Sequence, residues 1–321
     1  MSPHGFDGTS RFCSAPRGSA LEHKRPLHCR VPHCPERIEN NRVFSLSLVQ
    51  AAMQRALTDG ALQPIETGTI LLDSDGVRFV LRTVSSLARK DKARHGAGPT
   101  DPLGDYDRSL FVSDLTPSHY VLLNKFQVVA GHVLLVTRAF ERQERLLTVE
   151  DFAALVTCLS EVDGLAFYNG GAEAGASQRR KHLQLVPLPL AHESPDEVPM
   201  ERVLGSGSPL PFRHAFARVA PQATAPEWHA LYRELLDRCG ISAVATEEGE
   251  IQSASYNLLA RRGWMLVVPR SRECFESISV NGLGFAGSLF LRSQEALDRV
   301  RAIGPMQVLR AVAMLQDAQG P

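Results

Sequence analysis

The chain has 321 residues, of which 44% are hydrophobic and 22% charged, and its 35 basic residues balance its 35 acidic ones. This is the composition of a globular protein with one large domain or two coupled lobes, and the balanced charge gives no reason to expect nucleic acid or an anionic membrane as a partner. No apolar run approaches the roughly 20 residues that span a bilayer. The six cysteines lack the paired spacing of a disulfide framework, so we expect a reducing, cytoplasmic location.

Residues 1–42 differ from the rest of the chain. They are rich in Pro, Ser, Arg and His and show neither helical nor strand periodicity, which predicts a disordered extension, or else a start codon placed too far upstream. They lack the apolar stretch of a secretory signal. Their histidines and cysteines lie in one Pro-punctuated stretch, whereas zinc sites usually join two separated ligand pairs, so no metal site is expected here. The histidines and cysteines considered as zinc ligands are His28, Cys29, His33 and Cys34.

Ordered structure is expected from about Phe44 onward. Apolar residues recur at helical spacing over residues 48–56, which predicts a helix that ends at the following Asp-Gly pair. Residues 76–84 alternate and are β-branched, as in a strand, and residues 85–102 have the composition of a basic loop. Residues 120–140 contain two apolar runs separated by Ala-Gly, which predicts two adjacent strands.

The clearest helix signal follows Thr148. This residue and Asp151 form a capping-box pattern, an apolar stripe follows at helical spacing, and Gly164 ends the pattern. Residues 165–171 then resemble a strand with a glycine turn, and residues 181–190 resemble a further strand.

A second lobe is expected after the Pro-rich residues 188–227. Residues 226–240 carry a helical pattern that begins at proline and ends at glycine. Residues 264–269 and 283–292 are predicted strands, and a final helical region follows residue 293. Helices and strands mix without a regular βαβ rhythm, so the predicted fold class is α+β.

The stretch FYNGGAEAGASQRRKHLQ, residues 167–184, combines a glycine-rich turn with the start of a strand. Alternation along a strand places His182 and Gln184 on one face and turns Lys181 the other way. A turn rich in glycine and serine can direct several backbone N–H groups at one anion, and the basic run 179–181 adds positive charge beside it. The stretch therefore combines a nitrogen nucleophile, a side-chain amide and a phosphate cradle.

These groups suit phosphoryl or nucleotidyl transfer. An imidazole is largely neutral near pH 7, so one ring nitrogen has a lone pair that can attack phosphorus and form a covalent intermediate. The cradle would stabilise the negative charge on the phosphate oxygens. Taken alone, the same pattern also fits a packed histidine beside a solvated basic run.

Several long segments resemble one known family. They are GALQPIET (60–67), VRFVLRTVSSLARK (77–90), LLNKFQVVAGHVLLVTRAFERQERLLT (122–148), FYNGGAEAGASQRRKHLQLVPLPL (167–190), SYNLL (255–259) and WMLVVPRSRECFESISVNGLGFAGSLF (264–290). In these segments the chain resembles the ATP adenylyltransferases, or diadenosine tetraphosphate (Ap4A) phosphorylases, of the histidine-triad (HIT) superfamily. The resemblance implies an antiparallel sheet with packed helices, similar to galactose-1-phosphate uridylyltransferase. It also implies a HIT-like catalytic region over 43–190 and an ATP adenylyltransferase C-terminal region over 191–321.

The resemblance further implies a two-step reaction of a nucleotidyltransferase. The catalytic histidine attacks the α-phosphate of Ap4A, releases ATP and holds AMP, and inorganic phosphate then accepts the AMP to give ADP. The expected partners are therefore the small molecules Ap4A, ATP, ADP and phosphate. A divalent cation, normally Mg²⁺, is expected to accompany the polyphosphate and to neutralise part of its charge, with no metal ligands assigned to the protein.

The family's functional residues map onto specific positions of this sequence. By resemblance, His182 is the nucleophile, and Gln184 replaces the last histidine of the triad and hydrogen-bonds the reacting phosphate. The positions that match phosphate-contacting or nucleotide-contacting residues are Lys90, Asn169, Gly171, Gly175, Ser177 and Asn257. Two of them have a structural alternative, because the lysine would also fit as a solvated loop residue and Asn257 as a purely structural amide.

One residue departs from the family pattern. The family motif is HKHLQ, and here it is RKHLQ, so Arg180 occupies the first triad position. Related enzymes orient the nucleophilic ring through the backbone carbonyl of this residue, and a carbonyl survives substitution. We therefore expect Arg180 to preserve the chemistry and to change side-chain contacts to the substrate. A large gain of activity in an Arg180→His variant would contradict this expectation.

Two other functions fit the same residues. In a hydrolase, water would take AMP from the histidine, whereas a nucleotide sensor would bind Ap4A without forming a covalent adduct. A nucleic-acid-binding module finds little support, because the basic residues do not form a surface studded with aromatic residues. The sequence carries no signal for an oligomeric state.

Overall fold

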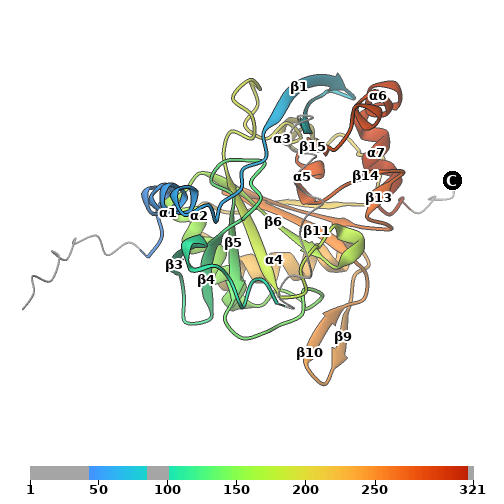
Figure 1. Ribbon diagram of the computed structural model, residues 1–321. Helices are drawn as coiled ribbons and strands as arrows, with labels where there is room; N and C mark the ends of the chain where they lie inside the picture. Colours follow the sequence, from blue (N-terminus) through green and yellow to red (C-terminus); the bar gives the residue numbers. More distant parts are fainter. Residues whose placement is uncertain (1–42, 85–100, 317–321) are drawn as a thin grey trace, which may run out of the picture. The chain divides into compact units, whose positions relative to one another are not determined.

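An eight-stranded antiparallel sheet is the main element of residues 43–84 and 101–316, the parts of the chain that the computed structural model describes (Figure 1). Its strand order is β3 (Phe111–Asp114), β4 (His119–Leu123), β5 (Val133–Thr137), β7 (His182–Pro187), β6 (Gly164–Gly170), β11 (Tyr256–Arg261), β12 (Trp264–Pro269) and β8 (Ala215–Arg218). The predicted α+β class with an antiparallel sheet is confirmed. The predicted extension 1–42 and Lys90 lie outside the described residues.

Three helices cover one face of this sheet. They are α1 (Leu46–Thr58), α2 (Val149–Glu161) and α4 (Ala225–Arg238). Their apolar stripes pack with the side chains that point to this face from the central strands. On β7 these are Leu183 and Leu185, so His182 and Gln184 face the opposite side, as alternation predicts.

A smaller sheet and four short helices cover the opposite face. In the three-stranded sheet, β1 (Thr67–Ser74) is antiparallel to β2 (Val77–Val84), and β15 (Ser288–Leu291) is parallel to β2. The helices are α3 (Glu201–Ser206), α5 (Gly282–Phe285), α6 (Gln294–Ile303) and α7 (Pro305–Val312). A second buried apolar cluster joins these elements to the main sheet, so the sheet is buried on both faces.

Two hairpins lie outside the larger sheets. β9 (Ala243–Thr246) pairs with β10 (Gly249–Gln252), and β13 (Cys274–Phe275) pairs with β14 (Ile278–Ser279). The β9–β10 hairpin projects from the lower edge of the molecule in Figure 1. In the described ranges, the regular elements that remain are the 3₁₀ turns Arg108–Leu110 and Ala172–Ala174, the second of which lies in the glycine-rich loop.

The main sheet is continuous across the predicted boundary between residues 190 and 191. Five of its strands precede this boundary and three follow it. The two sets join where β6 pairs with β11, and Asn169 lies directly opposite Asn257 in this pair. The division into two regions stays a prediction, and both regions contribute to one sheet.

Local sequence patterns located most of the regular elements. The capping box of α2 is present, with Thr148 accepting from the Asp151 N–H and the Asp151 side chain accepting from the Thr148 N–H. The two predicted strands within residues 120–140 are β4 and β5, and they pair with each other. The prediction that residues 283–292 form one strand is wrong in its first half. There, Asn281 caps the short helix α5, and Gly287, at φ 93°, turns the chain into β15.

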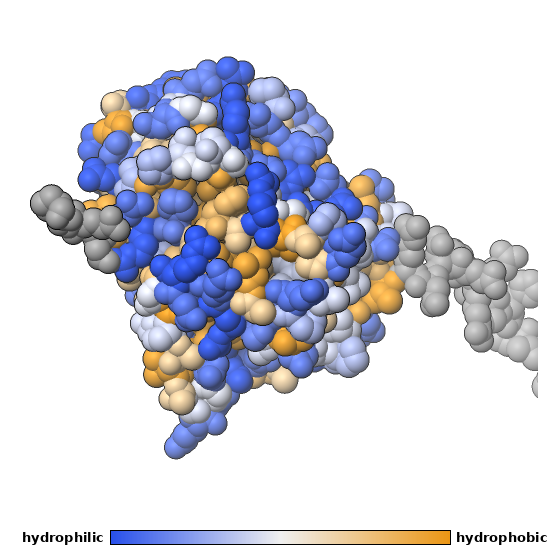
Figure 2. All heavy atoms as spheres, turned by 180° about the vertical axis from the view of Figure 1, so that it is seen from behind, coloured by the Kyte–Doolittle hydropathy of each residue, from blue (hydrophilic) through white to orange (hydrophobic). Residues whose placement is uncertain are grey.

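The surface is mainly hydrophilic. On the face shown in Figure 2, hydrophilic residues dominate and hydrophobic residues gather in a band near the middle. Several exposed large hydrophobic side chains lie on α1 or just before it, namely Val43, Leu46, Leu48 and Leu57. The others in the described residues come from separate segments, among them Phe126, Phe140 and Val244. Within the described ranges, no helix is both long and apolar enough to cross a membrane.

Candidate active site

A cavity of about 310 Å³ lies where the main sheet meets the three-stranded sheet. Its walls include residues of β2 and β15, the connection between β4 and β5, and residues of the segment 273–284. The residues assigned to the site from sequence that line it are Asn169, Gly175, Ser177 and Gln184. A larger hollow of about 810 Å³ lies beside α6 and α7, and it is lined by none of the assigned site residues that the structure describes. The smaller cavity is therefore the candidate site.

His182 is held in one orientation by the backbone of its own strand. Its Nδ1–H donates to the carbonyl oxygen of Arg180 at 2.8 Å. Burial lowers the pKa of His182 below its usual value, and the bond to the Arg180 carbonyl only partly opposes this effect. With the proton on Nδ1, the lone pair is on Nε2. The carbonyl contact expected from the sequence is confirmed, and it does not depend on the arginine side chain.

Gln143 separates β6 from β7 at the level of the nucleophile. The β6–β7 ladder stops where Phe167 pairs with Gln184. Beyond this point the Gln143 side chain lies between the strands. Its Nε2 donates to the carbonyls of Asn169 (3.0 Å) and His182 (3.2 Å), and its Oε1 accepts from the His182 N–H at 2.9 Å. The amide thus replaces a ladder pair and sets the spacing between two site residues. Sequence reasoning missed Gln143, which lies 39 residues before His182 in a charged stretch.

Gln184 is oriented by a second histidine that sequence reasoning also missed. The Asn124 side-chain amide donates to His132 Nδ1 at 3.0 Å, which leaves the ring proton on Nε2. This Nε2–H donates to Gln184 Oε1 at 2.9 Å. Burial lowers the pKa of His132 to about 4, so the ring is neutral near pH 7. Because Oε1 of Gln184 is occupied, its NH₂ group remains to donate to a ligand in the cavity.

The glycine-rich loop has the conformation that its glycines permit. Gly171 and Gly175 adopt φ values of 95° and 86°, which side chains rarely allow. Three amides of the loop, at residues 174, 175 and 176, donate to carbonyls of the loop itself, so they do not form the expected anion nest. Ser177 is exposed at the cavity wall. These three backbone N–H groups are therefore not free to donate to a phosphate, contrary to what the glycine content suggests.

The basic run is not a single charged surface. Arg180 is 9% exposed, and its guanidinium forms a two-pronged ion pair with Asp101 and donates to the carbonyls of Thr137 and Arg138. The hydrogen bond from Arg180 holds the pKa of Asp101 below its usual value. Arg180 therefore ties the segment at Asp101 to the ends of the interior strands β5 and β7, and its contact with substrate stays a prediction. Arg179 is exposed.

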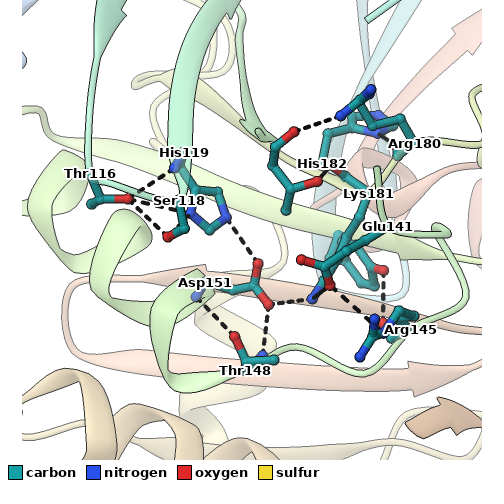
Figure 3. A network of polar contacts seen from close by, with 12 residues as sticks. Thr116, Ser118, His119, Glu141, Arg145, Thr148, Asp151, Arg180, Lys181 and His182 are labelled. Carbon is teal, nitrogen blue, oxygen red and sulfur yellow. Dashed lines mark hydrogen bonds and ion pairs between the residues drawn. The ribbon is translucent and has the colours of Figure 1, made fainter. Parts of the chain in front are cut away.

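Lys181 is buried on the face away from His182. Its ammonium lies 2.5 Å from the Asp151 carboxylate and 3.3 Å from that of Glu141, and Asp151 also accepts from His119 Nε2 at 3.0 Å (Figure 3). The expectation that Lys181 adds charge beside the glycine loop is wrong. The alternation of β7 turns it into the helix-covered face, where carboxylates neutralise it.

Asn257 does not line the cavity. Its side chain is fully buried and donates to Asn169 Oδ1 and to the carbonyl of Ala174, each at 2.9 Å. It thus contacts both the β6 asparagine and the glycine-rich loop. Gly282 approaches from the other side and donates its N–H to Asn169 Oδ1 at 3.0 Å.

The described residues do not provide a metal centre of their own. Within the described ranges, no three His, Cys, Asp or Glu side chains come together as metal ligands. Glu273 is the one carboxylate among the described residues that line the cavity. A cation here would take most of its oxygen ligands from phosphate groups and water, as Mg²⁺ commonly does.

Two family models match the chain. The Ap4A phosphorylase N-terminal domain matches residues 37–206, and the ATP adenylyltransferase C-terminal domain matches residues 208–315. Among curated proteins, the chain is 30% identical over 258 residues to diadenosine 5',5'''-P1,P4-tetraphosphate phosphorylase 2 of Saccharomyces cerevisiae, covering 67% of this chain and 76% of the relative. It is 26% identical over 287 residues to Protein APA1 of the same yeast, covering 79% and 88%.

Solved structures share the fold. The crystal structure of yeast Ap4A phosphorylase Apa2 matches with a TM-score of 0.71 and 24% identity, covering 87% of this chain and 98% of that one. The complex of the same enzyme with Ap4A matches with a TM-score of 0.71 and 22% identity, covering 86% and 100%. The likeness therefore extends over nearly the whole length of these proteins.

Proposed function

The chain belongs to the Ap4A phosphorylase family, and from this membership and the site geometry we propose that it transfers AMP from Ap4A to inorganic phosphate. The products are ATP and ADP, and the reverse direction makes Ap4A from ATP and ADP, which is the activity of an ATP adenylyltransferase. A yeast relative is named as an Ap4A phosphorylase, and a structure of the same fold holds Ap4A. Both support this substrate class.

In the proposed first step, Nε2 of His182 attacks the α-phosphorus of Ap4A. A nitrogen–phosphorus bond forms, the bond from phosphorus to the bridging oxygen breaks, and ATP leaves with the electron pair. The ring becomes positively charged, and the Arg180 carbonyl, which accepts from Nδ1–H, stabilises that charge. The amide NH₂ of Gln184 would donate to a non-bridging oxygen as negative charge moves onto it.

In the second step, an oxygen of inorganic phosphate attacks the same phosphorus from the side that ATP left. The nitrogen–phosphorus bond breaks, its electron pair returns to Nε2, and ADP is released. No general base is needed at either step, because the ring is already neutral and phosphate is already an anion.

The observation that carries the proposal is the hydrogen bond from His182 Nδ1 to Arg180, which leaves Nε2 unprotonated. It is tested by incubating the protein with Ap4A in the absence of phosphate and measuring intact mass. We expect one AMP adduct, lost in His182→Ala and retained in His192→Ala, a control at an exposed histidine. Binding of Ap4A with no adduct in the unsubstituted protein would indicate a nucleotide sensor.

The acceptor is tested in the same reaction. With phosphate present, we expect ADP and ATP in equal amounts. Production of AMP and ATP at a rate that does not depend on phosphate would instead indicate a hydrolase.

We also propose that a divalent cation, Mg²⁺, accompanies the polyphosphate, with oxygen ligands chiefly from the nucleotide. Chelation should slow turnover, and added Mg²⁺ should restore it. A cytoplasmic location is proposed as well, supported by Cys158, Cys239 and Cys274, the cysteines of the described ranges, which are free thiols.

A further inference from the structure

We infer that Asn257 and Arg270 are positioning residues that fix which end of the Asn169 side-chain amide faces the reacting phosphate. This inference rests on the proposed function. It assigns to Asn257 a role through Asn169 in place of direct contact with the nucleotide, and it adds Arg270, which the sequence did not single out.

Two donors of the protein hold the Asn169 side chain. This side chain lines the cavity from β6, and its Oδ1 accepts two hydrogen bonds, from Asn257 Nδ2 at 2.9 Å and from the Gly282 N–H at 3.0 Å. Both lone pairs of Oδ1 are thus used by the protein. In the described ranges no acceptor is hydrogen-bonded to Asn169 Nδ2, which leaves this NH₂ group to donate to a ligand oxygen.

Arg270 fixes the orientation of the Asn257 amide. An amide has one accepting end and one donating end, so its neighbours decide its orientation. Asn257 Oδ1 accepts from Arg270 Nη1 at 2.6 Å, and a guanidinium can only donate. The oxygen of Asn257 must therefore face Arg270, and its NH₂ must face Asn169. The oxygen of Asn169 must then face Asn257, which leaves its NH₂ for the cavity.

Arg270 is itself held rigidly by its surroundings. It is 1% exposed, and all five of its N–H groups are hydrogen-bonded. Besides Asn257, the acceptors are the carbonyls of Val280, Arg272, Glu273 and Val312. Burial lowers the pKa of Arg270 to about 10, which leaves it charged near pH 7. A charged donor with no spare N–H cannot turn. Arg270 therefore sets the orientation of the Asn257 amide, which in turn sets that of the Asn169 amide.

This arrangement links the two matched segments of the chain. Asn169 and the loop carbonyl of Ala174 belong to the first segment, whereas Asn257, Arg270 and Gly282 belong to the second. The second segment thus orients a donor on the first. If the direction were reversed, the oxygen of Asn169 would face the negatively charged phosphate and oppose binding.

The test reverses the direction with a change of nearly equal shape. In Asn257→Asp, a carboxylate faces Arg270, which balances its charge, and its other oxygen faces Asn169. Asn169 is then expected to turn and donate to the new carboxylate, at the loss of its hydrogen bond from the Gly282 N–H. The turned side chain presents its Oδ1 to the substrate. We expect the KM and Kd for Ap4A to rise about 10- to 100-fold, the effect of losing one hydrogen bond to a charged group.

A comparison with Asn257→Ala separates positioning from stability. Alanine leaves a cavity and an unpaired N–H on Arg270, so it should lower the melting temperature more than Asn257→Asp. It leaves Asn169 able to keep its NH₂ toward the substrate, so it should raise the Kd less. A merely structural role gives the opposite order for Kd, in which Asn257→Ala is the more damaging change, and this result would overturn the inference.

A double-mutant cycle completes the test. In an Asn169→Ala background, Asn257→Asp should change the Kd for Ap4A by less than about twofold, because the amide through which it acts is gone. An equal effect in both backgrounds would overturn the inference. Calorimetric binding of Ap4A reads this out even in a protein that does not transfer AMP, so failure of the proposed reaction and failure of the positioning role remain distinguishable.

Discussion

Replacing Lys181 with methionine should strongly destabilise the fold. Lys181 is next to the nucleophile in the sequence, but its side chain does not face the cavity, so the expected effect is on stability. Lys181 is 0% exposed, and its ammonium lies 2.5 Å from the Asp151 carboxylate (Figure 3). Methionine has a similar length and flexibility, so the change removes the charge and preserves most of the packing. The Asp151 carboxylate would remain buried with His119 and the Thr148 N–H as its partners.

The expected loss is about 3–5 kcal/mol of unfolding free energy, the usual cost of removing one partner from a buried ion pair. This is a large part of the roughly 5–15 kcal/mol that stabilises a typical domain. An exposed pair gives the contrast, because Arg78 and Asp73 lie 2.8 Å apart with side chains that are 42% and 70% exposed. Arg78→Met should therefore lower the unfolding free energy far less than Lys181→Met, because water screens an exposed pair.

The same carboxylate predicts how stability depends on pH. Burial alone would raise the pKa of Asp151, but the hydrogen bond from His119 and the charge of Lys181 outweigh it and lower the pKa to about 2 from 3.8. A lowered pKa stabilises the fold above pH 3.8, and this contribution, about 2 kcal/mol, is lost as the pH falls toward 2. In Lys181→Met the pKa should rise, so the acid loss of stability should begin at higher pH.

Denaturant titrations at pH 7 and pH 4 measure both effects. The double variant Lys181→Met/Asp151→Leu should recover part of the loss, because no unpaired charge remains buried. A loss in Lys181→Met no larger than in Arg78→Met would refute this reasoning.

Three further predictions concern the site. His132→Phe keeps an aromatic ring but loses the donor to Gln184, so kcat/KM should fall about tenfold with a small change in melting temperature. An unchanged kcat/KM would show that His132 does not contribute to the reaction. Gln143→Glu cannot donate to the carbonyls of Asn169 and His182, so single-turnover formation of the AMP adduct should slow more than tenfold, whereas an unchanged rate would show that this spacing is unimportant. Because burial lowers the pKa of His182, the acidic decline in a plot of kcat/KM against pH should be centred below 6.5, the usual histidine value. A decline centred above 6.5 would contradict a neutral nucleophile.

The sequence predicted those parts of the fold that depend on nearby residues. The capping box of α2 and the alternation that places His182 with Gln184 are set by neighbours within a few positions. The contact between His182 and the Arg180 carbonyl is equally local, which is why its expectation from a motif is confirmed. The glycine loop was located, but its amides bond internally, a choice that composition does not determine.

The remaining site contacts join distant positions and leave no periodic signal. Asp101 reaches Arg180 across 79 residues, and Asn257 reaches Asn169 across 88. Arg270 and Gln143 lie among other charged residues, in RSRE and ERQER, and no motif marks them out, so their roles follow from what surrounds them after folding. Lys181 was misplaced as surface charge because a basic run is usually solvated, whereas here Asp151 and Glu141 receive its ammonium inside the protein.

The pairing of β6 with β11 has a consequence for how this chain is made. If the chain were released or cut between the two matched segments, β6 would become an unpaired edge strand. Its seven residues, all buried in the intact protein, would then be exposed. Such an edge is a template for pairing with other chains. Synthesis from the N-terminus passes through this state until β11 emerges, so the first segment depends on a late partner to close its sheet, and a truncated product should aggregate and not persist as half an enzyme.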